Sequence, residues 1–148
     1  MVELREITES NYSECLNLKV SDDQLNFVAS NVYSLAQAWV FHETAYPFAV
    51  YAEDVMVGFV MMGYDGSKGV YFIWRFMIDR RYQGKGYGKA ALQLSIKYLV
   101  DRFGLREIYL SFMPGNTAAE NLYSGAGFQR TGEMDDDEIV MCLKTTAH

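Results

Sequence analysis

The spacing of hydrophobic positions in the first third of the chain changes from strand-like to helix-like. Residues 2–7 alternate apolar and polar side chains, which indicates a half-buried strand. Residues 8–10 then offer capping side chains for a helix. Leu25, Phe27 and Val28 are the apolar positions of a second helical region. The elements predicted here are a strand over 2–7, a short helix after Ser10, a helical region after Asp23 and a helix over 34–41.

The remaining two thirds of the chain are predicted to hold six more strands and two helices. Two strands flank Glu53 and Asp54, a tight acidic turn, and form a hairpin. Gly104 stands where the cap of a long helix is expected. The elements predicted here are strands 48–52, 55–62 and 70–78, helix 88–103, strand 106–112, helix 116–124, and strands 128–133 and 138–143. This order predicts one α+β domain over 1–148, with a mixed, mainly antiparallel central sheet flanked by helices.

Composition narrows the class of protein. The chain has 148 residues, of which half are hydrophobic and 15% aromatic, enough for one packed core. Two cysteines are too few for a disulfide framework and are expected to be reduced thiols. We find no apolar run long enough for a signal peptide or a membrane span. A cytoplasmic protein without a membrane partner is therefore the expectation.

Charge is unevenly distributed along a chain with a net charge of −6. Residues 1–54 carry nine acids and two bases, residues 55–131 five acids and ten bases, and residues 132–148 five acids and one base. A basic middle between acidic ends indicates a site for an anion and another for a cation. Ordinary solvated surface charge remains the alternative.

Three glycines fall between the strand that ends at Ile78 and the helix that begins near Gly88. Glycine allows tight turns and leaves backbone N–H groups unobstructed, and a helix N-terminus adds unsatisfied donors. Gly84, Gly86 and Gly88 therefore predict a pyrophosphate site. Basic side chains surround it: Arg80, Arg81, Lys85 and Lys89.

Two common phosphate-binding motifs do not fit this segment. When the Gly-Lys of a P-loop is placed on Gly88 and Lys89, Gln83 stands where the first glycine belongs and Ala90 where the hydroxyl belongs. A dinucleotide fingerprint starting at Gly84 would place its third glycine on Lys89. From this segment alone, a glycine-rich loop without a ligand also stays open.

The segment resembles the coenzyme A loop of the GNAT superfamily of N-acetyltransferases, Gln/Arg-x-x-Gly-x-Gly/Ala, at every fixed position of residues 83–88. Residues 75–79, Arg-Phe-Met-Ile-Asp, resemble the strand that precedes this loop in the family. Residues 116–128 resemble the later motif Asn-x-x-Ala-x-x-Leu-Tyr-x-x-x-Gly-Phe. With the order of elements, the resemblance covers the whole chain and implies the GNAT fold.

The resemblance implies that an amine attacks the thioester of acetyl-CoA directly, with acetyl-CoA as co-substrate and no metal. A strand splayed from its neighbour would hold the pantetheine arm and polarise the thioester carbonyl through its main chain. Tyr123 would protonate the departing thiolate. A helix cap at Asn116 and a buried core ring at Tyr123 are the structural alternatives. The implied cofactor-binding residues are Phe76, Met77, Ile78, Gln83, Gly84, Lys85, Gly86, Tyr87, Gly88, Lys89, Asn116 and Tyr123.

One position departs from the family. Some relatives place a glutamate, acting as general base, five residues before the motif asparagine, where this chain has Ser111. Serine is a poor base unaided. A water chain, an acid elsewhere such as Glu43, or bulk solvent would then take the proton of the amine.

The family forms its acceptor pocket from the early helices, the strand after the first hairpin and the last hairpin turn, which are the acid-rich regions here. Residues 20–24 and 74–79 look like bacterial spermine/spermidine acetyltransferases of this superfamily. A polyamine acceptor is therefore predicted, with Trp74 as an aromatic face for an ammonium group. The predicted acceptor-binding residues are Asp22, Asp23, Glu43 and Trp74, with residues 135–138 as a further acidic region.

Two other functions stay open at this point. A protein or peptide N-acetyltransferase would share the cofactor site, and a non-catalytic acyl-CoA sensor would bind coenzyme A without turnover. Nucleic acid is not an expected partner, because the basic residues cluster around the cofactor loop. The resemblance also makes a homodimer an expectation, with Trp39, Phe41 and Tyr46 on the partner surface.

Overall fold

One seven-stranded sheet forms the centre of the protein. The structure is a computed structural model that describes residues 1–25 and 27–145. The strand order is β1-β2-β3-β4-β5-β7-β6, and only β4 and β5 pair in parallel. The strands are β1 (Val2–Glu6), β2 (Ala45–Ala52), β3 (Val55–Asp65), β4 (Val70–Ile78), β5 (Glu107–Phe112), β6 (Gln129–Asp135) and β7 (Glu138–Lys144). The predicted α+β class with a mainly antiparallel sheet is confirmed.

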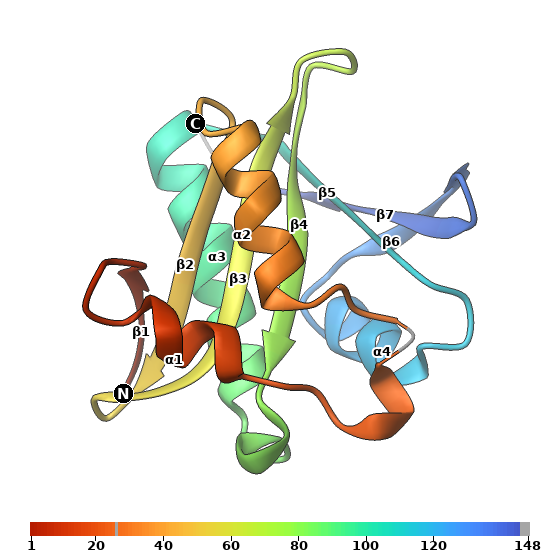
Figure 1. The fold of residues 1–148 in the computed structure, drawn as a ribbon. Coiled ribbons are helices and arrows are strands. Elements are labelled where there is room, and N and C mark those ends of the chain that lie inside the picture. The colour runs from red at the N-terminus through yellow and green to blue at the C-terminus, as the bar shows by residue number, and fades with distance from the viewer. Residues whose placement is uncertain (26, 146–148) are drawn as a thin grey trace.

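Helices cover both faces of this sheet (Figure 1). Short helix α1 (Tyr12–Asn17) and α2 (Asn31–Val40) pack on one face, where Cys15 and Ala38 join Phe59 and Met61 in one core. Helices α3 (Tyr87–Phe103) and α4 (Thr117–Gly125) pack on the opposite face in a second core. Two 3₁₀ turns, η1 (Asp22–Gln24) and η2 (Arg80–Tyr82), complete the elements. Among the described residues, no helix combines the length and the apolar character that a bilayer crossing requires.

The first hairpin turns where the sequence predicted it. Glu53 and Asp54 both adopt positive φ angles, 49° and 68°, as a two-residue hairpin turn requires. Strand β2 begins at Ala45, earlier than predicted, and so contains Pro47. Its missing N–H is tolerated because β1 pairs with β2 only as far as Phe48.

The prediction of a helical region after Asp23 is wrong in its extent. Only the three-residue turn η1 forms there, and Asn26 lies outside the described residues. The apolar side chains of Phe27 and Val28 line a cleft instead of the buried face of a helix. Helix α2 begins at Asn31, because the Oγ of Ser30 accepts a hydrogen bond from the Tyr33 amide at 3.1 Å and caps the helix there.

Both cysteines are free, as the sequence predicted. Cys15 is fully buried, and burial raises the pKa of its thiol to about 11. The thiol therefore stays protonated at neutral pH. Cys142 lies half-buried in β7.

The feature that positions the site is the separation of β4 from β5. The two strands pair only at Phe72 with Tyr109 and at Ile73 with Leu110. Beyond Ile73, β4 continues to pair with β3 while β5 runs diagonally away from it (Figure 1). The edge of β4 from Trp74 to Ile78 is therefore left without a partner strand. The splayed strand implied by the family resemblance is present in the fold.

Candidate active site in the cleft between β4 and β5

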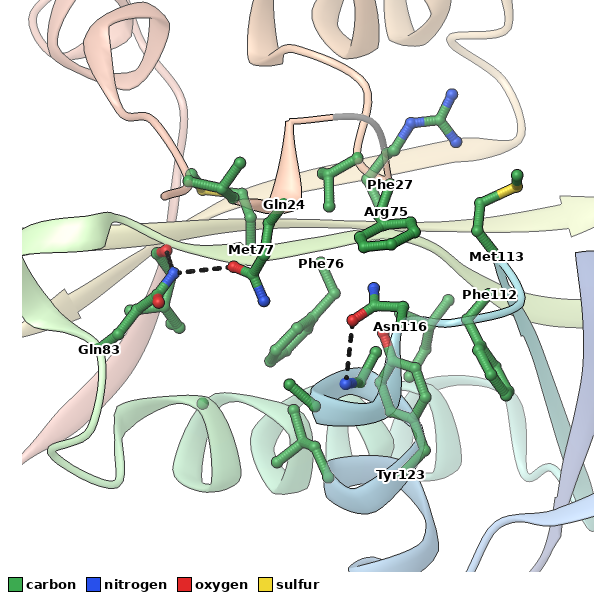
Figure 2. Close-up of a pocket in the computed structure, with 18 of the residues that line it drawn as sticks. Gln24, Phe27, Arg75, Phe76, Met77, Gln83, Phe112, Met113, Asn116 and Tyr123 are labelled. Atoms are coloured by element: carbon green, nitrogen blue, oxygen red, sulfur yellow. Dashed lines mark hydrogen bonds between the residues drawn. The ribbon is translucent and has the colours of Figure 1, made fainter. Parts of the chain in front are cut away.

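A cleft of about 600 Å³ opens where β4 and β5 separate. One wall consists of the end of β4, the glycine-rich loop and the start of α3. The opposite wall consists of the end of β5, helix α4 and the first residue of β7. Gln24 and Phe27, from the segment between α1 and α2, lie at the cleft as well (Figure 2).

The β4 wall presents main-chain groups to the cleft. The amide of Asp79 donates to the Val57 carbonyl of β3 at 2.8 Å. Because successive residues of a strand point their N–H and C=O groups to opposite edges, Met77 also faces β3, whereas Phe76 and Ile78 face the open edge. The side-chain amide of Gln83 donates to the Ile78 carbonyl at 2.9 Å, as this alternation requires. Two amides of β4 are thus free of strand pairing beside the cleft.

Met77 contributes to the cleft differently from its neighbours. Its side chain belongs to the core on the α1 and α2 face, where the Nδ2 of Asn31 lies 3.9 Å from its sulfur. Phe76 packs against the opposite core. The main-chain groups of Phe76 and Ile78, not their side chains, face the open edge of β4, which is why their side-chain types do not reveal this feature.

The glycine-rich loop needs glycine for its backbone conformation. Gly84 and Gly86 have φ angles of 78° and 84°, and Gly86 is the cap residue of α3. No atom lies within 4 Å of where a Cβ would stand at either position, so space is not the reason. The free N–H groups at the start of the 17-residue helix α3 add a positive end to this wall.

The basic residues of the loop lie outside the cleft lining. Lys85 and Lys89 are exposed beside it, and Gly86 is exposed between them. Arg81 pairs with Asp79, whose Oδ1 lies 2.8 Å from its Nε. The predicted loop residues that do line the cleft are Gln83, Gly84, Tyr87 and Gly88.

Asp79 connects the β4 wall of the cleft to the segment before η1 through hydrogen bonds. Its side chain is only 3% exposed and accepts hydrogen bonds from the amides of Lys19 and Arg81, both at 2.9 Å. Burial alone would raise the pKa of Asp79, but the bonds from Arg81 and Lys19 hold it below its ordinary value. The carboxylate therefore joins the segment before η1 to the loop after β4.

Tyr123 stands on the opposite wall. Its ring packs against Phe76, Phe112 and Phe128 at centroid distances of 6.5, 6.3 and 6.2 Å. Figure 2 shows the side chain rising from α4 between Phe76 and Phe112. Burial raises the pKa of Tyr123 to about 12, so its phenol is protonated at neutral pH. Within the described residues the hydroxyl has no hydrogen-bond partner, which leaves its proton available to a ligand.

Asn116 caps α4, as one of its two interpretations predicted. Its Oδ1 accepts a hydrogen bond from the Ala119 amide at 3.3 Å, and the residue is 8% exposed. It also lines the cleft (Figure 2). The cap therefore leaves the residue in place for a ligand contact.

The predicted acceptor-binding residues separate into two groups. Trp74 lines the cleft, and Asp22 and Asp23 are exposed in η1 directly before Gln24, which also lines it. Gln24 is held there by the amide of Gln83, 3.3 Å from its Oε1. Glu43 lies in the turn after α2, and the ten residues of α2 span about 15 Å. Glu43 itself does not line the cleft, although Phe41, two residues earlier, packs against Trp74 at 5.9 Å.

Sequence reasoning did not single out the two charged side chains that do line the cleft, Arg75 and Glu138. Arg75 donates to the Trp74 carbonyl at 3.0 Å and to Oε1 of Gln37 at 2.9 Å, while its Nε–H is buried without a partner in the described chain. Burial lowers the pKa of Arg75, and the charge of Glu138 opposes that shift. The sequence signals for Glu138 were the count of acids near the last hairpin and the family resemblance, which implies that residues 135–138 lie at the acceptor pocket.

Comparison with known proteins identifies relatives across nearly the whole chain. The sequence model of the Acetyltransferase (GNAT) family matches residues 2–128. The chain is 36% identical over 140 residues to the spermine/spermidine N(1)-acetyltransferase of Bacillus subtilis, which covers 90% of this chain and 91% of that protein.

Solved structures show the same fold. The spermidine N-acetyltransferase of Vibrio cholerae, in complex with CoA and spermine, superimposes with a TM-score of 0.79 at 18% identity, over 99% of this chain and 96% of that one. A ribosomal L7/L12 α-N-protein acetyltransferase in complex with coenzyme A gives a TM-score of 0.81 at 16% identity, over the same shares of the two chains. No three metal-ligating side chains gather among the described residues.

Proposed function

The chain belongs to the acetyltransferase (GNAT) family, and from that premise we propose that it transfers an acetyl group from acetyl-CoA to a primary amine of spermine or spermidine. The observation that carries the choice of acceptor is the 36% identity to a spermine/spermidine N(1)-acetyltransferase over 90% of the chain. Transfer takes place in a ternary complex by direct attack of the amine. Acetyl-CoA is the co-substrate.

The wall of β4 and the glycine-rich loop fits the coenzyme. The free main-chain amides of Phe76 and Ile78 suit the carbonyl groups of the pantetheine arm and of the thioester. The segment from Gly84 to Lys89, at the positive end of α3, suits the pyrophosphate. Asn116 lies where it can bond the arm from the opposite wall. Tyr123, protonated and without a partner in the described chain, donates its proton to the departing sulfur.

The acceptor enters the cleft past η1 and meets Trp74 on the β4 wall. Asp22 and Asp23 are exposed there and draw a polycation toward the cleft by long-range attraction. Trp74 offers an aromatic face to an ammonium group. The positions of Asp22, Asp23 and Trp74 support a role in binding the polyamine, whereas the position of Glu43 gives no such support.

A second acceptor class is favoured by one observation. The fold superimposes on a protein α-N-acetyltransferase at a TM-score of 0.81, slightly above the value for the spermidine enzyme. An N-terminal peptide amine is therefore the alternative acceptor.

A turnover screen tests the proposal. The full chain is supplied with acetyl-CoA and with spermine, spermidine, other small amines and N-terminal peptides, and free thiol release is followed. We expect the highest kcat/KM for spermine or spermidine. A preference for peptides would select the alternative, and coenzyme A binding without turnover on any amine would identify a non-catalytic sensor.

We also propose that the protein is a homodimer. Trp39 is 78% and Phe41 50% exposed, large apolar side chains at the end of α2. Tyr46, the third residue expected on this surface, packs instead against Phe103 at 5.4 Å and is half-buried. Sedimentation of the wild-type chain and of Trp39→Ser tests this, and two identical monomeric profiles would contradict it.

A further inference from the structure

Glu138 is the only carboxylate among the described residues that line the cleft. It is the first residue of β7, directly after the turn of the last hairpin, and its side chain is half-buried. The lining is otherwise apolar or neutral except for Arg75. A carboxylate in such a place needs a physical explanation, because burial of an ionised group is costly unless it has partners.

The position of Glu138 is related to that of Ser111. Strands β5 and β7 pair with Ser111 opposite Val140 and Phe112 opposite Ile139, so the start of β7 runs beside the end of β5. The Oγ of Ser111 donates a hydrogen bond to Oε1 of Glu138 at 3.4 Å. Ser111 occupies the position where some relatives carry a glutamate base. The neighbouring strand therefore brings a carboxylate to the place that β5 itself leaves without one.

The wall of β5, β7 and α4 also places Glu138 within electrostatic reach of Tyr123. After burial, the charge of Glu138 is the second cause of the raised pKa of Tyr123. Both side chains line the same cleft, one from α4 and the other from β7. An acceptor amine lying between them would have a proton acceptor on one side and a proton donor on the other.

We propose that Glu138 is a catalytic residue that takes up the proton lost by the attacking amine, with Ser111 as its positioning residue. This rests on the proposed amine acetyltransferase function. The amine nitrogen forms a bond to the thioester carbonyl carbon, and the carbon–sulfur bond breaks with its electron pair going to sulfur. One proton passes from the nitrogen to the Glu138 carboxylate, and Tyr123 supplies one to the sulfur. The products are the amide and the free thiol.

The surroundings of Glu138 suit a proton acceptor. Burial raises the pKa of Glu138, and the charges of Asp135 and Asp137 in the hairpin turn raise it further. The hydrogen bond from Ser111 on β5 and the charge of Arg75 on β4 oppose this and favour the ionised form. On α4, Tyr123 faces it as a neutral phenol. A carboxylate whose pKa is raised toward neutral pH is the better general base.

The test compares Glu138→Gln with Glu133→Gln. Glu133 is exposed in β6, outside the cleft lining, so the same change of side chain is made in the same hairpin. We expect Glu138→Gln to lower kcat for spermidine by about 100-fold while its KM stays within about threefold. In the wild type, kcat/KM falls at low pH as Glu138 is protonated, and this fall should be missing in Glu138→Gln. Glu133→Gln should match the wild type in kcat and in its pH dependence.

Ser111→Ala provides the positioning test. The variant should move the fall in kcat/KM to higher pH, because the ionised carboxylate loses a hydrogen bond, while KM for acetyl-CoA stays unchanged. Coenzyme A binding and the unfolding temperature establish that each variant is folded.

Three outcomes would overturn the proposal. Glu138→Gln could retain kcat and the fall in kcat/KM at low pH, or it could raise only the KM for spermidine, which would make Glu138 a binding carboxylate. Equal losses of kcat in Glu138→Gln and Glu133→Gln would point to the charge of the last hairpin as a whole. A wild-type chain without turnover on any amine would instead contradict the proposed function, so the two failures are distinguishable.

Discussion

The two walls of the cleft perform their proposed roles with different kinds of group, main-chain amides on one wall and side chains on the other. The wall of β4 and the glycine-rich loop offers main-chain groups: free amides at Phe76 and Ile78, and the N-terminus of α3 after Gly86. The wall of β5, β7 and α4 offers side chains, above all Tyr123 and Glu138. Main-chain groups are present whatever the side chain is, so the first wall depends on backbone shape. The second depends on the identity of single residues.

This difference predicts how the activity and the stability of the protein should respond to mutations in each wall. On the side-chain wall, removal of one oxygen should abolish a chemical step without unfolding the protein. On the main-chain wall, the same loss of activity requires a change in backbone conformation or in its anchors, and it should be accompanied by a change in stability. Four predictions test the distinction, from the largest expected effect to the smallest.

Tyr123→Phe should lower kcat by about 100-fold or more, because it removes the proton donor while the ring keeps its packing. The unfolding temperature should change little. Stopped-flow thiol release and a thermal melt measure the two effects. Tyr98→Phe, which also removes a phenol hydroxyl but lies on α3 outside the cleft lining, is the control. Near-normal turnover of Tyr123→Phe would mean that Tyr123 is not the acid.

Asp79→Ala should lower the free energy of unfolding by about 1–2 kcal/mol, because it leaves the part-buried amides of Lys19 and Arg81 without their acceptor. The folded pKa of Asp79 lies below its ordinary 3.8, so its contribution is present above that pH and is lost as the pH falls through the folded pKa. The difference in the free energy of unfolding between the wild type and Asp79→Ala should therefore become smaller below about pH 4.

Urea unfolding at pH 7 and at pH 3 measures that difference. The control is Asp101→Ala, whose carboxylate pairs with Lys97 on the surface of α3 and is 60% exposed. Its loss should cost at most about 0.5 kcal/mol. An equal difference at the two pH values would show that the ionised form of Asp79 is not what stabilises this wall.

Gly86→Ala should cost about 1–2 kcal/mol of stability, because alanine is strained at a φ of 84°. It should also weaken acetyl-CoA binding, since the start of α3 shifts. Gly88→Ala is the matched control in the same loop: no positive φ is required there, and an added Cβ would meet only ordinary contacts at 3.7 and 3.8 Å. Calorimetric titration with coenzyme A compares them, and equal affinities for both variants would contradict the main-chain role.

Asp22→Asn combined with Asp23→Asn should raise the KM for spermidine by only a few-fold, because both carboxylates are exposed and screened. The effect should shrink as the salt concentration increases. Glu43→Gln should leave KM unchanged, since Glu43 does not line the cleft. If Glu43→Gln had the larger effect, the assignment of the acceptor entrance to η1 would be wrong.

The secondary structure was largely predictable where a local cause exists. The Glu53–Asp54 turn, the Gly104 cap and the Asn116 cap all depend on neighbours within a few residues, and the structure confirms them. The prediction of a helical region after Asp23 was wrong in extent, because Phe27 and Val28 have helix-compatible spacing but are half-buried in the lining of the cleft. Periodicity does not distinguish the inner face of a helix from the lining of a cleft.

The sequence by itself determined the glycine-rich loop, the order of the elements and the membership of the family. These depend on backbone conformation and on contiguous motifs, and both are determined by residues that are close together in the sequence. Only the tertiary structure decided which acid reaches the cleft. Glu43 and Glu138 have the same chemistry and both lie in acid-rich regions, but strand pairing brings Glu138 beside Ser111 in the cleft lining, whereas Glu43, in the turn after α2, does not line the cleft. Proximity between residues distant in the chain is set by the sheet, and no local pattern encodes it.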